Sequence, residues 1–364
     1  MNETKIYLPG LNGLRAFAAL SVVIAHLSLK GIADFGLPVV DDIPMAGFGV
    51  TLFFVISGFL ITYLLLKELN KQSNIDIKKF YARRILRIWP IYYLFIIICL
   101  CVLILLGKQH EILSNEMWYY LFFTANIPFI LQQGIFILLH YWSIGVEEQF
   151  YLFWPWIVLK SRNKLLKITV VIFLLLFVTK LLFWWYFGSS SYEYRFISVT
   201  RFHCMMVGAI GAILYFKNQI GFKNLFSNKT TQIVSWLLFI LMGFNIIYIP
   251  AVIAHEVISV ASLSMIMGQI ILHNRIFNLE NRLFDFIGKI SYSIYIIHPL
   301  IIFLLSGFFK ELNIEKNLKF VLVYSSVIVV TIFIAWLSYT FFEKPFLKLK
   351  VKFAVVESSN SMLS

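Results

Sequence analysis

The sequence has 364 residues, of which 60% are hydrophobic and only 13% charged, and its mean hydropathy is +0.84. Soluble domains carry about 25% charged residues, so this composition excludes an ordinary soluble domain and also a disordered chain. Apolar runs long enough to cross a hydrocarbon core of about 30 Å recur along the whole sequence. The chain is therefore predicted to be all-α, a polytopic bundle of transmembrane helices in a lipid bilayer.

About ten apolar stretches of roughly 20 residues are separated by charged residues, Gly, Pro and Asn, and each is expected to be one span. The N-terminal sequence lacks a basic region followed by an apolar stretch and a cleavage site, so the first span is expected to be retained. The stretch 108–139 is interrupted by polar residues and is expected to lie at the outer face or to be partly re-entrant. The predicted spans are 12–29, 46–67, 88–107, 140–159, 164–187, 196–216, 232–249, 251–272, 284–306 and 319–341.

Lys and Arg residues gather in alternate loops, and basic loops are retained on the cytoplasmic side of a membrane. Both termini are therefore expected to be cytoplasmic, with 1–349 as the membrane domain and 350–364 as a disordered tail. The net charge of +13 is explained by this topology and by anionic lipid, so no nucleic-acid partner is expected. The basic clusters lie at 67–87, 160–167, 217–229, 275–289 and 344–352.

The first span carries two ionisable residues, Arg15 and His26. Their spacing of eleven residues places them within about 20° of one helix face and roughly 16 Å apart along the axis. An ionisable residue inside a span indicates a functional site unless it is paired or faces water. A ligand with an anionic head and a long arm could contact both residues. Alternatively, Arg15 snorkels to the interface and His26 is an unrelated hydrogen-bonded residue.

The basic loop before the third span contains Arg83, Arg84 and Arg87. Residues three and four apart share a helix face, so these side chains are expected to form a cationic cluster that binds phosphates. An ordinary positive-inside anchor is the alternative.

Two adjacent acids, Glu147 and Glu148, lie about two turns into the fourth span. Neighbours on a helix point about 100° apart, so one carboxylate is expected to face the bundle centre while the other meets a second partner. A structural salt bridge to a buried cation is the alternative.

Further polar residues lie towards the expected outer side: Trp142, Ser143, Arg201, Tyr295 and His298. We expect them to line an acceptor site, although aromatic residues also collect at any membrane interface.

No serine or cysteine nucleophile motif, nucleotide-binding glycine loop or metal-ligand spacing is found, so no metal is expected. The three cysteines lie in apolar runs and are expected to be packing residues.

Five segments, in this order, resemble the acyltransferase 3 family of integral membrane acyltransferases. They are LPGLNGLRAFAALSVVIAHL, GVTLFFVISGFLIT, FYARRILRIWPIYY, LHYWSIGVEEQFYLFWP and ISYSIYIIHP. The resemblance implies transfer of an acyl group, commonly acetyl, from cytoplasmic acyl-CoA to a hydroxyl of a carbohydrate or lipid-linked glycan, in a bacterial inner membrane. Some members carry an additional C-terminal extracytoplasmic domain, and this sequence is expected to differ from them because it ends soon after EKPFLKLK. The membrane domain is thus expected to act alone or with a separate extracytoplasmic partner.

A mechanism follows from these expectations. His26 is predicted to be the general base, with Glu147 or Glu148 orienting its ring. Arg15 and the arginines of the basic loop are predicted to hold the phosphates of CoA. Direct transfer and a covalent acyl-histidine remain open. A proton-coupled transporter or flippase is the alternative function, and a sensor without chemistry is a third.

Overall fold

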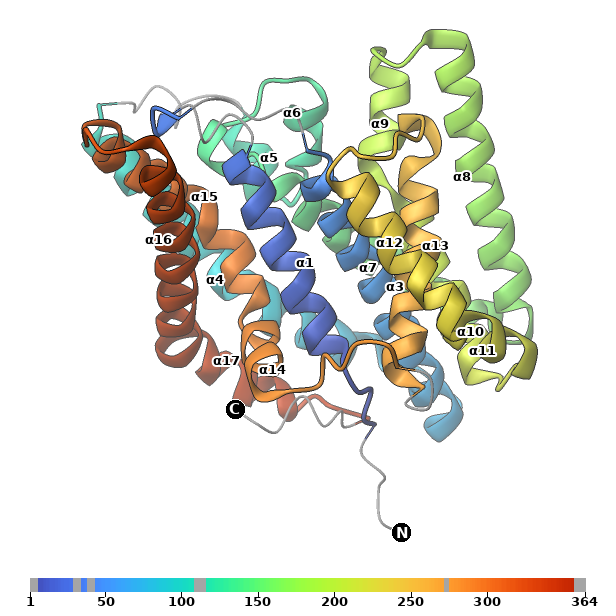
Figure 1. Cartoon of the computed structure of the whole chain (residues 1–364). Coiled ribbons are helices and arrows are strands. Elements are labelled where there is room, and N and C mark those ends of the chain that lie inside the picture. Colours follow the sequence, from blue (N-terminus) through green and yellow to red (C-terminus); the bar gives the residue numbers. More distant parts are fainter. Residues whose placement is uncertain (1–5, 29–33, 38–42, 108–115, 272–274, 357–364) are drawn as a thin grey trace.

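The computed structural model describes residues 6–28, 34–37, 43–107, 116–271 and 275–356, and the elements of this part are helices (Figure 1). Short helices and turns connect the longer helices. The longer helices are α1 (Leu11–His26), α3 (Met45–Gln72), α4 (Ile77–Leu105), α7 (Tyr141–Ser161), α8 (Leu165–Phe187), α10 (Phe202–Phe216), α12 (Lys229–Gly243), α13 (Ala251–Ile270), α15 (Ser291–Lys310) and α16 (Lys316–Leu337). The short ones are α5 (Met117–Leu121), α6 (Asn126–Ile130), η3 (Phe136–Leu138), η4 (Arg162–Lys164), α9 (Tyr192–Thr200), α11 (Ile220–Ser227), α14 (Arg282–Lys289), the π-helical turn η6 (Ser338–Glu343) and α17 (Lys344–Val351).

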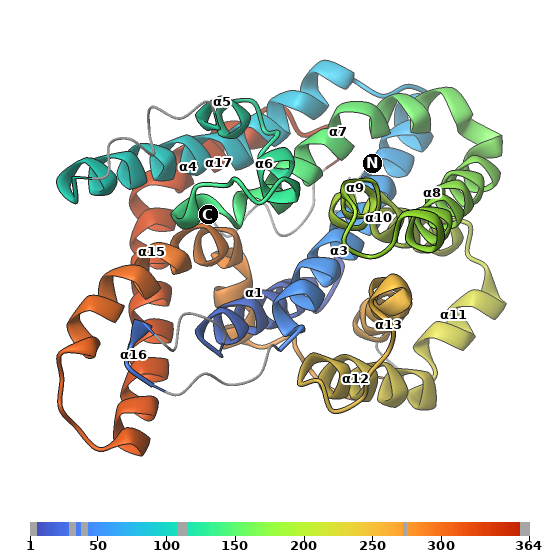
Figure 2. The ribbon, with the colours of Figure 1, turned by 90° about the horizontal axis from the view of Figure 1, so that it is seen from above.

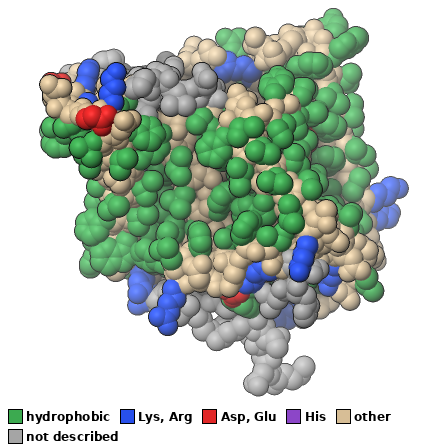
Figure 3. Space-filling view, in the orientation of Figure 1, with side chains coloured by type: hydrophobic (Ala, Val, Ile, Leu, Met, Phe, Trp, Pro, Cys, Tyr) green, Lys and Arg blue, Asp and Glu red, His purple; other side chains and the backbone are tan. Residues whose placement is uncertain are grey.

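The helices have the length and composition of a multi-pass membrane protein. Among the described residues, seven helical stretches are long and apolar enough to cross a membrane, and one of them, Tyr141–Phe187, comprises both α7 and α8. The helices α1 and α12 are apolar but shorter. Hydrophobic side chains cover the middle of the face seen in Figure 3, and Lys and Arg lie mainly near its edges. The membrane bundle is confirmed, whereas the count of ten spans and the cytoplasmic termini stay predictions.

Each predicted span overlaps a helix, but most boundaries differ by several residues, and three differences have a clear local cause or divide a span. The helix α4 begins at Ile77, eleven residues before the predicted span, because Asp76 caps it by accepting a hydrogen bond from the Lys79 backbone N–H at 3.0 Å. This bond lowers the pKa of the Asp76 carboxyl. The sixth predicted span divides at Arg201, whose φ of 47° lies in the left-handed region, and the ninth divides at Ile290.

The segment 108–139, expected at the outer face or partly re-entrant, is irregular where it is described. Residues 108–115 lie outside the described part of the chain. The remainder forms only the short elements α5, α6 and η3. Such short helices and turns agree with the predicted interruption of the apolar pattern.

The helices α1 and α3 cross the middle of the bundle, with α15 and α16 on one side and α12 and α13 on the other (Figure 2). The helix α3 packs against α1, α10 and α13. Its approach to α10 depends on glycine, because a Cβ at Gly58 would lie 2.1 Å from Met205 O and one at Gly208 would lie 2.1 Å from Val55 O. Small residues allow such close helix contacts in membranes.

The described part of the predicted disordered tail, residues 350–356, lies against the start of α4. The Arg83 guanidinium donates a hydrogen bond to Phe353 O at 2.8 Å, and Lys71 donates one to Val355 O at 3.4 Å. Val355 is buried. Residues 357–364 lie outside the described part.

Candidate active site

A cavity of about 70 Å³ lies between α1, α3, α4, α7 and α15. It brings together six of the residues singled out in the sequence, although they come from four different helices. These are Arg15, Arg84, Arg87, Ser143, Glu147 and Tyr295. Further polar groups in its wall are Ser57, Tyr151, Ser291 and Tyr292.

Three arginines line this cavity. The guanidinium groups of Arg15, Arg84 and Arg87 make no hydrogen bond or ion pair with a described residue, and the Nε of Arg84 is buried. The Arg84 guanidinium instead lies over the rings of Phe80 and Tyr151, at 5.8 and 5.7 Å from their centroids. Removing charge from water is costly unless the charge is compensated, so three half-buried cations in one cavity favour the binding of an anion.

Arg83 belongs to a different environment, although it is the direct neighbour of Arg84. Its Nη2 lies 3.1 Å from the Oε2 of Glu68, which is buried, and its Nη1 bonds the tail at Phe353. Arg83 does not line the cavity. The structure therefore separates this arginine from Arg84 and Arg87, with which it was grouped.

The two glutamates point to different partners, as their helical spacing requires. Glu147 faces the cavity, where its Oε1 accepts a hydrogen bond from Ser57 Oγ at 2.6 Å. Glu148 Oε2 accepts one from Trp89 Nε1 at 3.1 Å. In the described structure neither carboxylate is hydrogen-bonded to His26. The expectation that one of them orients the His26 ring is wrong, because that ring has another partner.

The partner of His26 is His298. The Nδ1 of His26 lies 2.7 Å from the Nε2 of His298, and the rings are stacked with an interplanar angle of 22°. The Nδ1 of His298 lies 2.8 Å from Tyr295 O and 3.2 Å from Ile294 O. A backbone carbonyl only accepts, so His298 Nδ1 carries a proton and its Nε2 has the lone pair when the ring is neutral. His26 therefore donates through Nδ1, and its Nε2 is left as the basic nitrogen.

The histidine pair is connected to the cavity through Tyr295. Tyr295 lines the cavity, its carbonyl accepts from His298, and its hydroxyl lies 2.6 Å from Ser143 Oγ. His298 is fully buried, whereas His26 is partly exposed and is not part of the cavity wall. His26 is thus connected to the cavity wall through His298 and Tyr295.

Trp142 and Arg201 lie against each other near the start of α7 and α10. The Arg201 guanidinium is 5.1 Å from the centroid of the Trp142 ring, and Phe129 stacks on this ring at 5.2 Å. Arg201 also donates to Gly47 O at 3.0 Å. Trp142 is 8% exposed in this arrangement, and its role at an acceptor site stays a prediction.

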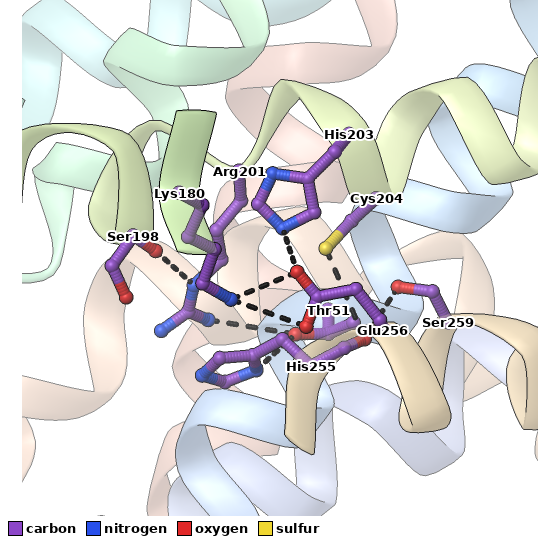
Figure 4. Close-up of polar contacts among 9 residues, drawn as sticks. All are labelled: Thr51, Lys180, Ser198, Arg201, His203, Cys204, His255, Glu256 and Ser259. Carbon is purple, nitrogen blue, oxygen red and sulfur yellow. Dashed lines mark hydrogen bonds and ion pairs between the residues drawn. The ribbon is translucent and has the colours of Figure 1, made fainter. Parts of the chain in front are cut away.

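A second polar cluster, whose Lys180 and Glu256 were not predicted as site residues, joins α8, α10 and α13 (Figure 4). The fully buried Lys180 Nζ lies 2.8 and 3.1 Å from the two carboxylate oxygens of Glu256, and His203 Nε2 lies 3.0 Å from Oε1. His255 directly precedes Glu256, and its Nδ1 lies 3.0 Å from Thr51 Oγ1. The sequence did contain an indication of this cluster, because Lys180 and Glu256 are ionisable residues within apolar stretches.

A second cavity, of about 60 Å³, shares part of its wall with the first. Both are lined by Arg15, Arg87 and Tyr292. The second adds Lys289 and Lys350, among others, to its wall. Neither lysine was proposed as a site residue, because each lies in a basic cluster that topology alone explains.

Two further features were considered in the sequence, possible metal ligands and the three cysteines. Among the described residues, no group of three or more His, Cys, Asp or Glu side chains could hold a metal ion. Cys99 and Cys204 are buried, as expected for packing residues, but Cys101 is exposed on α4.

Comparison with known proteins gives a consistent result. A family model described as "Acyltransferase domain" matches residues 8–340. The chain is 30% identical to a Staphylococcus aureus (strain COL) protein provisionally named an O-acetyltransferase, over 97% of this chain and 60% of that protein. It is also 30% identical to the O-acetyltransferase OatA of S. aureus (strain NCTC 8325), over 94% of this chain and 57% of OatA. The chain thus spans about three fifths of the length of these relatives, and no solved structure matches it.

Proposed function

The chain belongs to the acyltransferase 3 family, and from this premise we propose that it moves an acyl group from acyl-CoA to a hydroxyl of a carbohydrate. The observation that carries the proposal is the cavity with three arginines that have no hydrogen-bond or ion-pair partner in the described chain. Acyl-CoA would supply the missing anions, because its pyrophosphate presents several oxygens to guanidinium groups.

The donor would enter from the cytoplasmic side of a bacterial inner membrane, where the basic loops are expected. Arg15, Arg84 and Arg87 would hold its phosphates. The pantetheine arm would then extend along the cavity wall towards Ser143 and Tyr295, beside the histidine pair. Arg83 is left out of this phosphate site because Glu68 already pairs with it.

His26 would act as the general base through Nε2. In the simplest mechanism, this nitrogen takes the proton of the acceptor hydroxyl while the hydroxyl oxygen attacks the thioester carbonyl. The carbon–sulfur bond then breaks, and the sulfur of CoA leaves with the proton returned by His26. The products are an ester and free CoA. A covalent acyl-histidine, in which Nε2 itself attacks the thioester, would use the same atoms in two steps.

The names of two relatives support transfer of an acetyl group to an oxygen atom. We propose acetyl as the acyl group and a surface polysaccharide or lipid-linked glycan as the acceptor. A separate extracytoplasmic partner would deliver or modify this glycan where the membrane domain does not reach it.

A second candidate function, a proton-coupled transporter or flippase, is favoured by the cluster of Lys180, His203 and Glu256. Ionisable groups buried within a membrane bundle often form proton relays. A transporter would not cleave a thioester, so the two functions differ in whether free CoA appears.

The test is release of free thiol from acetyl-CoA by the purified protein in lipid nanodiscs, with a panel of glycans as acceptors. We expect wild-type release that His26→Ala abolishes while donor binding is retained, and that Arg84→Ala/Arg87→Ala lowers through weaker donor binding. If the folded wild-type protein neither binds acetyl-CoA nor releases thiol, the acyltransferase proposal fails for this substrate and the transporter becomes the better hypothesis.

A further inference from the structure

The second cavity extends the first towards α14 and α17. The residues common to both, Arg15, Arg87 and Tyr292, form the junction. The first cavity reaches from this junction to Ser143 and Tyr295, and its α3 wall runs from Val50 to Ile61. Eleven helical residues correspond to about 16 Å, so the two cavities together suit an elongated ligand.

We propose that the second cavity binds the adenosine end of CoA and that Lys350 holds its 3′-phosphate. This inference rests on the proposed function, because it assumes that the donor is an acyl-CoA. In CoA the pyrophosphate lies between the pantetheine arm and the 3′-phosphorylated adenosine. The two cavities and their junction present the same order, because Arg15 and Arg87 lie between the part of the first cavity at Ser143 and Tyr295 and the second cavity with Lys350.

The second cavity has two cations besides the shared Arg15 and Arg87, namely Lys289 and Lys350. Of these two, Lys350 has no acidic partner among the described residues. The Nζ of Lys289 lies 2.7 Å from Asp285 Oδ2. The carboxylate of Glu343 is engaged by Ser293 Oγ at 2.6 Å and Ser338 Oγ at 3.2 Å. Lys350, in contrast, makes no hydrogen bond or ion pair through its side chain with any described residue. A phosphate would provide the charge that this lysine lacks.

The backbone around Lys350 is held in place. The helix α17 follows directly on the π-helical turn η6, and π-helical turns occur frequently at functional sites. Beyond α17, Arg83 donates to Phe353 O. The ion pair with Glu68 holds the Arg83 guanidinium in position, and Arg83 in turn holds the backbone just after α17.

A comparison of two nucleotides tests this inference directly. The probes are CoA and 3′-dephospho-CoA, and the measurement is calorimetric affinity for the full-length protein in nanodiscs. The wild type should bind CoA at least about tenfold more tightly than 3′-dephospho-CoA, since a charge-assisted phosphate contact is lost. Lys350→Met should weaken CoA binding by a similar factor and bind the two nucleotides equally, whereas Lys350→Arg should keep the preference.

Lys348→Met is the matched control, because Lys348 is on the same short helix but is exposed and outside the cavity wall. It should leave both affinities unchanged. The ratio of two affinities on one preparation does not depend on the folded fraction. A Lys350→Met protein that keeps the wild-type ratio would refute the role of Lys350. A folded wild type that binds neither nucleotide would instead refute the proposed donor itself.

Discussion

His26 and His298 lie on different helices, α1 and α15, and their facing ring nitrogens are 2.7 Å apart. Two backbone carbonyls fix the proton of His298 on Nδ1, so His298 acts as the acceptor for His26. In other catalytic sites a carboxylate orients the histidine base. Here a second, fully buried histidine occupies that place.

The first prediction concerns this pair. His298→Leu should lower the rate of acyl transfer by about 100-fold, because His26 loses the acceptor that sets its tautomer and stabilises its protonated ring. His298→Gln should keep most of the activity, since its amide oxygen can still accept from Nδ1. Thiol release measures the rate, and ¹⁵N NMR of labelled histidine reports which nitrogen of His26 carries the proton. Equal losses in both variants, with unchanged tautomer, would leave His298 a packing residue only.

The second prediction contrasts two arginines of one basic segment. Arg87→Ala should weaken acyl-CoA binding by about 10- to 100-fold, because a charged hydrogen bond contributes about 1.5–3 kcal/mol. Arg83→Ala should change donor affinity much less, but it should lower stability by about 2 kcal/mol or more because buried Glu68 loses its partner. Calorimetric binding and thermal unfolding in detergent separate these effects. A stronger binding defect in Arg83→Ala than in Arg87→Ala would contradict the assignment.

The fold was largely predictable because apolar length identifies spans, and each predicted span overlaps a helix. The predicted boundaries were wrong where a cap or a turn, rather than the apolar run, sets the end of a helix. Asp76 starts α4 well before the apolar run, and Arg201 ends α9 with a left-handed backbone conformation. A search for apolar runs does not detect caps and turns.

The site was predictable residue by residue, but not pair by pair. The sequence indicated Arg15, His26, Glu147 and His298, yet it could not show that His26 pairs with His298 rather than with a carboxylate. Such pairing depends on the rotation of each helix about its axis, and packing against neighbouring helices sets that rotation. Lys350 was not predicted as a site residue for another reason. It lies in a basic segment, and the positive-inside rule alone accounts for a lysine there.

The third prediction concerns the buried ion pair between α8 and α13. Lys180→Met should destabilise the protein by about 3–5 kcal/mol, because Glu256 would keep a buried charge without its closest partner. The double variant Lys180→Met/Glu256→Gln should recover much of this loss, since both charges are removed. Unfolding in detergent monitored by intrinsic fluorescence gives both values. If the double variant is no more stable than Lys180→Met alone, then lost packing rather than an unpaired carboxylate causes the defect.

The fourth prediction concerns the close contact of α3 and α10. Gly58→Ala should destabilise the bundle by about 1–3 kcal/mol, because the new Cβ would lie 2.1 Å from a backbone oxygen, Met205 O, and one of the two helices would have to shift. Gly307→Ala is the control within α15, where a Cβ meets nothing within 4 Å. It should be neutral or stabilising by up to about 1 kcal/mol, since alanine favours the helix over glycine. Both are measured by thermal unfolding under identical detergent conditions. Equal stability of the two variants would mean that α3 and α10 can separate at no cost, which would contradict the packing of the bundle around α3.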